Sequence, residues 1–301
     1  MTATPLYSLG EDTALQRLLD KIKAPKGEQL LLGPGDDCAI VQRNDAWDTL
    51  LKTDALVEGI HFTPDTPAEL IGRKALARPV SDIAAMGGLP EHALITLFVH
   101  QSRPIEQLEG IYAGLSDFAA EQGIALAGGE TSALPQDGLA ISIALTGRVE
   151  RGGAILRSGG KPGDLLYVSG ALGGSFQSGK HLTFTPRVQL ARELLRRGIR
   201  PSAMMDISDG LAVDLPRLAQ ASGCGYAIEE AHLPCQEGCT PQQALCDGED
   251  YELLLALPPA LADQAELESL GLIRIGLLIP GKADRMPGGW QHFSTPAHNL
   301  S

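Results

Sequence analysis

Acidic side chains recur in four short segments of the sequence, each beside a glycine and an apolar run. The segments are GPGDDCAI at 33–40, KTDALVEGIHF at 52–62, MMDISDGL at 204–211 and DGEDYELLL at 247–255. Asp82 follows Ser81, and Glu130 follows a pair of glycines. One Asp-Gly pair is usually only a turn, because Asp tolerates the backbone that a turn requires. Repetition at points so far apart in the chain predicts one shared site.

These carboxylates are expected to gather without compensating Lys or Arg. Like charges repel one another, so the group would stay together only if bound cations neutralised it. Oxygen ligands suit Mg²⁺, which keeps several waters and often bridges to substrate phosphates. Phosphoryl transfer needs little more, since its catalysis is mostly positioning and charge stabilisation. The pattern therefore predicts a Mg²⁺-dependent phosphate site built from many carboxylates.

Two other kinds of site fit the sequence less well. The segment at 174–180 matches G-x4-G-K, but His181 follows where a phosphate loop needs Ser or Thr, so a flexible Gly/Ser loop is expected. One His and three Cys between 232 and 246 have the spacing H-x2-C-x3-C-x6-C, which lacks the paired C-x2-C motifs of strong zinc sites. The odd total of five cysteines indicates reduced thiols.

Helices and strands alternate around the acidic segments of the first half. Apolar spacing predicts a packed helix at 11–23, formed through Leu15, Leu18, Leu19 and Ile22, and helices at 67–77 and 104–123. Strand patterns occupy 49–56, 92–99 and 139–147, and two more strands enter turns at 30–37 and 124–131. Asp37 and Asp54 therefore fall where strands end. Pro79 is expected to break its helix, so that Asp82 either caps the next helix or joins the site.

A glycine-rich stretch at 152–163 marks a predicted boundary between residues 1–150 and 151–301. Beyond it the patterns predict strands at 165–170 and 251–258, helices at 186–197 and 209–222, and a final helix-strand unit at 259–279. The predicted fold class is therefore α/β (α+β), in two halves of similar size.

Composition limits the possible partners. The 301 residues are 44% apolar and 20% charged, as in a globular protein with a substantial core. Lys and Arg number 24 against 37 Asp and Glu, giving a net charge of −13, which argues against binding a nucleic-acid backbone. No run approaches the ~20 apolar residues that span a bilayer, and the N-terminus has no basic region followed by an apolar one. A cytoplasmic protein without nucleic-acid or membrane partners is expected.

Seven motifs occur in order between residues 33 and 254. They are GPGDDCAI, KTDALVEGIHF, RKALARPVSDIAAMGG, AGGET, RSGGKPGD, MDISDGLAVDL and DGEDYELL. The ordered set resembles the ATP-binding superfamily of aminoimidazole ribonucleotide synthetase. Within it, the VEG-x-HF, EDYELL and GGWQHF elements are most similar to the thiamine-monophosphate kinase family.

The resemblance implies a two-domain fold and an activity. Residues 1–150 would bind ATP and Mg²⁺ and form a β-barrel across a homodimer, and residues 151–301 would form a C-terminal α/β domain. The implied reaction moves the γ-phosphoryl group of ATP directly to thiamine monophosphate. Two alternatives stay open: a ligase like aminoimidazole ribonucleotide synthetase, and a non-catalytic homologue that binds nucleotide.

The same resemblance assigns roles to single residues. Several Mg²⁺ ions would be held by Asp37, Thr53, Asp54, Asp82, Glu130, Asp206 and Asp209, with Lys52 adding only its backbone. Asp54, Asp82 and Asp209 would act in catalysis through these metals. ATP would meet Tyr112, Gly129, Glu130, Arg157 and Ser208. Thiamine monophosphate would meet His61, Glu249 and Trp290, although Trp290 is also suited to packing as a plug over the core.

Four positions depart from the pattern of this family. Glu130 replaces a usual Asp, Pro79 a usual Asn, Asp247 a usual Gly, and Lys52 a usual Ser or Thr. If the family ligates metal through the hydroxyl at position 52, one metal site would be weakened here and the ammonium would partly substitute for the metal. The segment from 174 to 187 also looks short, which would reshape the rim of the site.

Overall fold

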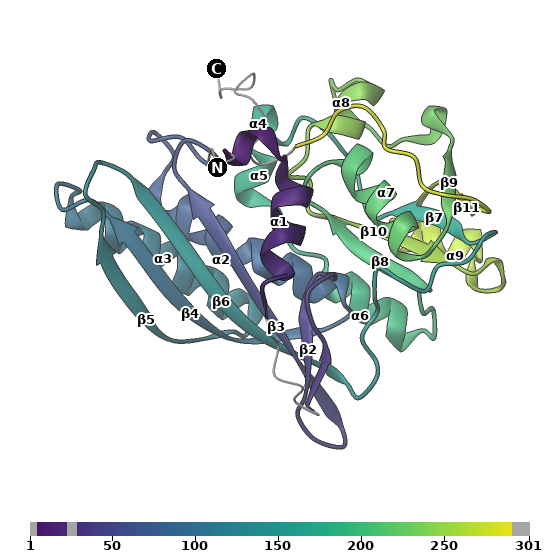
Figure 1. The fold of residues 1–301 in the computed structure, drawn as a ribbon, viewed down its shortest axis with the longest axis horizontal. Helices are drawn as coiled ribbons and strands as arrows, with labels where there is room; N and C mark the ends of the chain where they lie inside the picture. The colour runs from purple at the N-terminus through teal and green to yellow at the C-terminus, as the bar shows by residue number, and fades with distance from the viewer. Residues whose placement is uncertain (1–4, 23–28, 291–301) are drawn as a thin grey trace.

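The computed structural model describes residues 5–22 and 29–290, which form two β-sheets with helices packed against them (Figure 1). The first sheet has the order β1-β2-β3-β6-β4-β5. Its strands are β1 (Leu30–Leu32), β2 (Ala39–Gln42), β3 (Trp47–Val57), β4 (Leu89–Val99), β5 (Ala125–Ala133) and β6 (Leu139–Glu150). β4 and β5 pair in parallel and the other neighbours are antiparallel, so this sheet is mixed.

The second sheet is antiparallel throughout, with the order β8-β10-β7-β11-β9. Its strands are β7 (Leu165–Val168), β8 (Ala203–Ile207), β9 (Gly225–Ile228), β10 (Glu252–Leu257) and β11 (Ile273–Ile279). The helices of this half are α4 (Ser175–Ser178), α5 (Lys180–Thr183), α6 (Val188–Arg196), α7 (Leu211–Ala221), α8 (Pro241–Cys246) and α9 (Gln264–Ser269). Short 3₁₀ turns are η1 (Leu6–Ser8), η2 (Glu230–His232) and η3 (Pro259–Leu261). The α/β class is as predicted, and the domain boundary at residue 150 stays a prediction.

Two long helices, α2 (Ala68–Ala85) and α3 (Ile105–Gln122), cover one face of the first sheet (Figure 1). They approach closely through glycines. A methyl group on Gly72 would lie 1.9 Å from the carbonyl oxygen of Ile111, and one on Gly114 would lie 1.9 Å from that of Glu69. α2 also contacts α5, α6 and β8. This helix therefore belongs to the packing of both halves.

α2 runs unbroken through Pro79, so the predicted break and the N-cap role of Asp82 are wrong. A proline inside a helix removes one backbone hydrogen bond and costs ~3 kcal/mol. Almost all side chains from Ile71 to Ala85 are buried, and this burial offsets the local cost. Asp82 consequently lies inside a buried helix.

Two predicted turns are strand interior instead. Asp54 lies within β3, and Gly128 and Gly129 lie within β5, so the expectation that strands end at these points is wrong. A side chain on Gly129 would place its Cβ 1.8 Å from the carbonyl oxygen of Ile95 on β4. The glycine allows close pairing of the two strands and makes no turn.

The N-terminal helix α1 (Glu11–Leu19) does not pack as predicted. Leu15, Leu18 and Ile22 are 53%, 65% and 60% exposed, whereas Ala14 is buried. The helix precedes the first sheet and lies on the surface of the chain (Figure 1). Its apolar spacing therefore does not contribute to the core of the single chain.

The predicted flexible loop at 174–180 is also wrong, because the segment folds into α4 and the start of α5. Lys180 Nζ lies 3.0 Å from Glu252 Oε1 and 2.8 Å from the carbonyl oxygen of Ala171. Arg187 adds two hydrogen bonds of 2.7 Å to the same buried Glu252. Lys180 thus anchors the segment to a carboxylate, unlike the lysine of a phosphate loop.

None of the helices in the described part of the chain combines the length and apolar character needed to cross a membrane. The residues of the GGWQHF element after Trp290 lie outside the described residues.

Candidate active site

Three predicted carboxylates meet where the two halves of the chain adjoin. Asp37 follows β1, Asp82 lies on α2, and Asp206 lies on β8. One carboxylate oxygen from each lies within 4.8 Å of the others. All three residues are buried, at 2%, 7% and 4% exposure. Segments far apart in the sequence thus form one carboxylate cluster, defined here as Asp37, Asp82 and Asp206.

Each member of the carboxylate cluster accepts a hydrogen bond from a neighbouring side chain. Ser81 Oγ donates to Asp206 Oδ2 at 2.7 Å, and Lys52 Nζ donates to Asp82 Oδ1 at 2.6 Å. Arg157 donates to Asp37 Oδ1 through Nε and Nη2, at 3.1 and 2.5 Å. These contacts hold the three carboxylates in place.

The second carboxylate oxygen of Asp37 indicates whether the cluster could bind a metal ion. Asp37 Oδ2 is buried and has no hydrogen-bond partner among the described residues. Leaving a buried acceptor unsatisfied costs about 1–3 kcal/mol, and more for a charged group. A divalent cation that takes oxygen ligands would satisfy it. The residues of the carboxylate cluster therefore fit Mg²⁺.

The expectation that these carboxylates lack compensating cations is wrong. Besides Lys52 and Arg157 in the carboxylate cluster, the ion pairs Arg78–Asp54 at 3.3 Å and Arg217–Asp209 at 2.5 Å flank it. The cationic residues come from several elements, so only the fold brings them to the acidic motifs.

Burial governs the protonation of the carboxylate cluster. It raises the pKa of Asp206 to about 6, and the charge of Asp37 adds to the rise. It raises the pKa of Asp82 well above its usual value, although the Lys52 ammonium opposes this. Burial alone would lower the pKa of Lys52, but the charges of Asp82 and Asp54 raise it above its ordinary value. Lys52 is accordingly charged at neutral pH.

The Ser208–Asp209 turn joins the carboxylate cluster to a cavity. Asp214 is fully buried in the first turn of α7, and its Oδ2 accepts the backbone N–H groups of Ser208 and Asp209 at 3.0 and 2.9 Å. Arg217 donates to both Asp209 and Asp214. Asp214 therefore fixes the direction in which Asp209 points.

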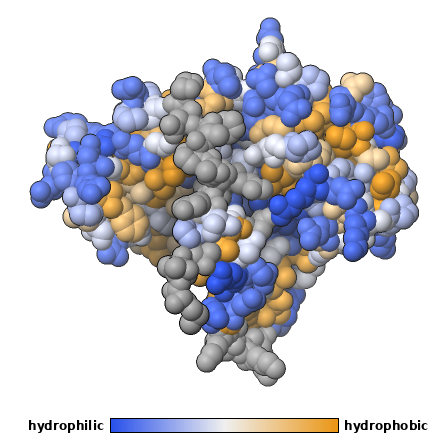
Figure 2. Space-filling view, turned by 45° about the horizontal axis from the view of Figure 1, so that its top comes forward, coloured by the Kyte–Doolittle hydropathy of each residue, from blue (hydrophilic) through white to orange (hydrophobic). Residues whose placement is uncertain are grey.

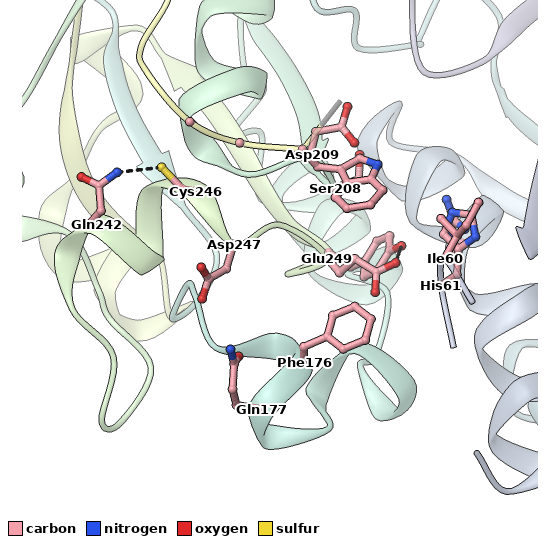
Figure 3. Close-up of a pocket in the computed structure, with 15 residues that line it drawn as sticks. Ile60, His61, Phe176, Gln177, Ser208, Asp209, Gln242, Cys246, Asp247 and Glu249 are labelled. Atoms are coloured by element: carbon pink, nitrogen blue, oxygen red, sulfur yellow. Dashed lines mark hydrogen bonds between the residues drawn. The ribbon is translucent and has the colours of Figure 1, made fainter. Parts of the chain in front are cut away.

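A cavity of about 470 Å³ lies beside this turn (Figure 3). His61 reaches it from the first half of the chain, whereas Ser208, Asp209, Glu249 and Trp290 reach it from the second. Apolar and polar groups from both halves complete the wall: Ile60, Arg78, Phe176, Gln177, Gln242, Cys246, Asp247, Tyr251, Gly288 and Gly289. The three residues predicted to meet thiamine monophosphate thus share one cavity.

Lys74 connects two of these three residues across the halves. This α2 lysine is fully buried, and its Nζ lies 2.6 Å from both the carbonyl oxygen of His61 and Glu249 Oε2. Burial lowers the pKa of Lys74 to about 8, although the carboxylate of Glu249 opposes this. Lys74 therefore sets the separation between His61 and Glu249 in the cavity wall.

The backbone on the Glu249 side of the cavity is strained. Glu249 and Tyr251 have φ values of 53° and 51°, in the left-handed region that non-glycine residues seldom adopt. Their N–H groups bond to the carbonyl oxygens of Ser208 and Ile207, at 2.7 and 2.8 Å. Such strain persists only where surrounding contacts over-determine it. The contacts here keep the Glu249 carboxylate at the cavity.

Thr53 and Glu130, two predicted metal ligands, lie away from the carboxylate cluster. Side chains alternate along β3, so Thr53 faces opposite to Lys52 and Asp54. Glu130 pairs with Thr96 on β4 and is exposed on the same outer face of the first sheet. Gly129 lies beside it on β5, and Tyr112 is 40% exposed on α3.

Family models define the class of protein to which this arrangement belongs. The model for the AIR synthase related protein N-terminal domain matches residues 35–149, and that for the AIR synthase related protein C-terminal domain matches residues 163–282. The fold and the paired models define an AIR synthase related protein.

Comparison with individual relatives identifies the family within this class of proteins. A thiamine-monophosphate kinase of Rhodopirellula baltica is 35% identical, with 89% of this chain and 88% of the relative covered. That of Escherichia coli K12 is 34% identical, with 95% and 99% covered. The solved structure of AaThiL complexed with AMPPCP and TMP has a TM-score of 0.85 and 29% identity, covering 97% of this chain and all of that one. The chain belongs to the thiamine-monophosphate kinase family.

Sequence reasoning missed several residues that shape the site. Lys74 and Arg78 lie one helical turn apart on α2, and their i, i+4 spacing was a signal that both would face the same way. Asp214 lies five residues after Asp209 in a helix start, where a carboxylate commonly bonds backbone N–H groups. Phe176 carried no signal, because the Gly/Ser-rich segment around it predicts a flexible loop.

Proposed function

We propose that this chain phosphorylates thiamine monophosphate by direct in-line transfer of the γ-phosphoryl group of ATP. The observation that carries the proposal is the position of the cavity. Its wall holds His61, Glu249 and Trp290, and it also includes Ser208 and Asp209, which follow Asp206 of the carboxylate cluster in the chain. In this proposal a substrate phosphate and a triphosphate would approach each other there. Membership of the kinase family and the AMPPCP and TMP bound in a related structure support the same reaction.

The acceptor requires no general base. A phosphate monoester has a second pKa of about 6, so it is largely ionised and nucleophilic at neutral pH. The protein then has to align the two phosphates and exclude water. Transfer without a phosphoenzyme follows, because no protein nucleophile is needed to carry the group.

The carboxylate cluster, with Asp54 and Asp209 beside it, would hold Mg²⁺. Bound Mg²⁺ would neutralise oxygens of the triphosphate as charge moves. Arg157, which donates to Asp37, would meet the nucleotide together with Ser208. The longer side chain of Glu130 would still ligate through oxygen if a second copy of the chain brought it to the site.

The cavity residues suit the organic part of thiamine monophosphate. His61 Nδ1 accepts the backbone N–H of Val57 at 3.0 Å, so the neutral ring carries its proton on Nε2 and donates from there. The Glu249 carboxylate supplies an acceptor and negative charge for a cationic, amine-bearing ligand. Trp290 is 37% exposed at the cavity, and its backbone N–H bonds to the carbonyl oxygen of Asp209 at 2.9 Å. An indole held there would cover the thiazolium ring by a cation–π contact of ~1 kcal/mol.

ADP release tests the proposal. Purified protein with ATP and Mg²⁺ should release ADP with thiamine monophosphate, and not with thiamine or formylglycinamidine ribonucleotide. ATP made chiral at its γ-phosphorus should give product with inverted configuration, as single in-line transfer requires. Turnover on the purine intermediate alone would instead favour a ligase. Tight nucleotide binding without turnover on any thiamine phosphate would favour a non-catalytic homologue.

We also propose that two copies of the chain pair through the outer face of the first sheet. Leu51 and Leu94 are 41% and 49% exposed there, around a shallow apolar hollow. Figure 2 shows apolar surface on the side of the molecule where Figure 1 places this sheet. Thr53 and Glu130, which the family resemblance assigns to metal binding, lie on the same face. A second copy would cover the apolar surface and place both residues at an interface.

Light scattering with size exclusion measures this pairing. Leu94→Asp should convert a dimer into a monomer and reduce turnover, because it puts a charge in the apolar hollow. Ile105→Asp changes a similarly exposed side chain on α3 and should leave the dimer intact. A monomeric wild-type protein with full activity would contradict the pairing.

A further inference from the structure

The ammonium group of Lys52 places a positive charge at the carboxylate cluster. It lies on β3 two residues before Asp54, so both side chains face inward from the same side of the strand. Its Nζ lies 2.6 Å from Asp82 Oδ1, and only 22% of the Lys52 side chain and 10% of the Asp82 side chain are exposed. The ammonium therefore sits against the carboxylate cluster and is largely shielded from water.

Charge balance shows what this ammonium does. When all three carboxylates of the cluster are ionised, they face two cationic side chains, Lys52 and Arg157, and one negative charge remains. The flanking Asp54 and Asp209 are each paired with an arginine. Asp37 Oδ2 has no hydrogen-bond partner within residues 5–22 and 29–290, so a further cation is expected beside this oxygen. On the Asp82 side of the carboxylate cluster, the Lys52 ammonium already supplies a positive charge.

A lysine ammonium is a compact point charge with three donors on a flexible stem. Mg²⁺ must give up some of its tightly held water before carboxylates can bind it. The ammonium is covalently attached and is present at any metal concentration. It also repels a divalent ion that approaches the same oxygen, and burial weakens the screening of that repulsion.

We propose that Lys52 takes the place of a divalent ion on the Asp82 side of the carboxylate cluster, leaving the nucleotide-free chain one strong divalent position, beside Asp37. Lys52 thereby lowers the number of divalent ions that the site requires, and it also weakens the binding of the remaining ion. The inference rests on the proposed function in treating the cluster as a metal site. It concerns the binding of metal to the free protein, so its test needs no turnover.

Calorimetry and electron paramagnetic resonance with Mn²⁺ as the probe test this idea on the full chain without nucleotide. Lys52→Met should bind Mn²⁺ about tenfold more tightly or better than wild type, because a cation next to the ion has been removed. It should also take up one more ion per chain at saturation. Lys52→Arg keeps the charge and should resemble wild type. Lys161→Met removes an exposed lysine outside the cluster and should leave Mn²⁺ binding unchanged.

Two results would overturn the proposal. Unchanged Mn²⁺ affinity and stoichiometry in Lys52→Met would show that the ammonium does not occupy a metal position. Weaker binding in a folded Lys52→Met would show that Lys52 organises the ligands instead. Circular dichroism and thermal unfolding check that the variant folds, and Lys52→Thr provides a second neutral variant. Absence of kinase activity would refute the proposed function and leave the Mn²⁺ comparison valid.

Discussion

The buried Lys74 should make the protein more stable as pH rises above 8, and Lys74→Met should lack this rise. Burial lowers the Lys74 pKa from an ordinary 10.5 to about 8, with Glu249 opposing the decrease and Arg78 adding to it. The unfolded chain therefore binds this proton more tightly than the folded chain does. Below pH 8 the folded protein carries a penalty of about 3 kcal/mol for keeping the ammonium buried. The penalty is lost as pH rises from 8 to 10.5.

Urea unfolding at several pH values measures the effect. Between pH 7 and 9.5 the free energy of unfolding of wild type should rise by about 2 kcal/mol relative to Lys74→Met, from a slope of about 1.4 kcal/mol per pH unit above pH 8. Other titrating groups are common to both proteins and cancel in the difference. Parallel stability curves for the two proteins would refute the argument, because they would mean that Lys74 titrates alike in the folded and unfolded chains.

Three further substitutions probe the fold and the site. Glu252→Gln should cost about 3 kcal/mol of stability by urea unfolding, since a buried carboxylate loses its charge between Lys180 and Arg187; an unchanged midpoint would contradict this. Trp290→Ala should raise the KM for thiamine monophosphate about fivefold and leave that for ATP unchanged, from a contact of ~1 kcal/mol, and equal effects would exclude stacking on the thiamine. Asp214→Asn should lower kcat at least about tenfold with near-normal folding, because an amide has one acceptor oxygen and cannot both accept the two backbone N–H groups and bond to Arg217, so the Asp209 turn would shift. Normal turnover there would mean that the turn holds without Asp214.

The meeting of the acidic segments was predictable, whereas their neutralisation was not. Asp37 and Asp206 carry local signals, because acidic segments with glycines and apolar runs stand out in a sequence, whereas the sequence left Asp82 open between a helix cap and the site. The pairing of Arg78 with Asp54 and of Arg217 with Asp209 depends on how helices pack beside strands and turns. Ion pairs between different helices, strands and turns have no characteristic spacing in the sequence. The expectation of uncompensated carboxylates failed for that reason.

Local rules failed where tertiary packing outweighed them. Pro79 normally ends a helix, but α2 is buried along most of its length and continues. The Gly128–Gly129 pair is typical of a turn in sequence. In the structure Gly129 lies in a strand, and no larger residue would fit because the β4 backbone lies against it. Strand and helix positions elsewhere followed apolar periodicity, as for β4 and α3. Periodicity reports which face is buried, and it carries no information about how closely two backbones approach.

The position of α2 between the two sheets ties the halves into one unit. From this helix Lys74 bonds to Glu249, and Ser81 bonds to Asp206. Tyr251 and Phe184 of the second half stack on each other and pack into the core of the first. Separating the halves at the glycine-rich connection would expose part of each hydrophobic core and would divide the candidate site. The enzyme should therefore melt in a single cooperative transition, and neither fragment should be a self-sufficient module for domain exchange.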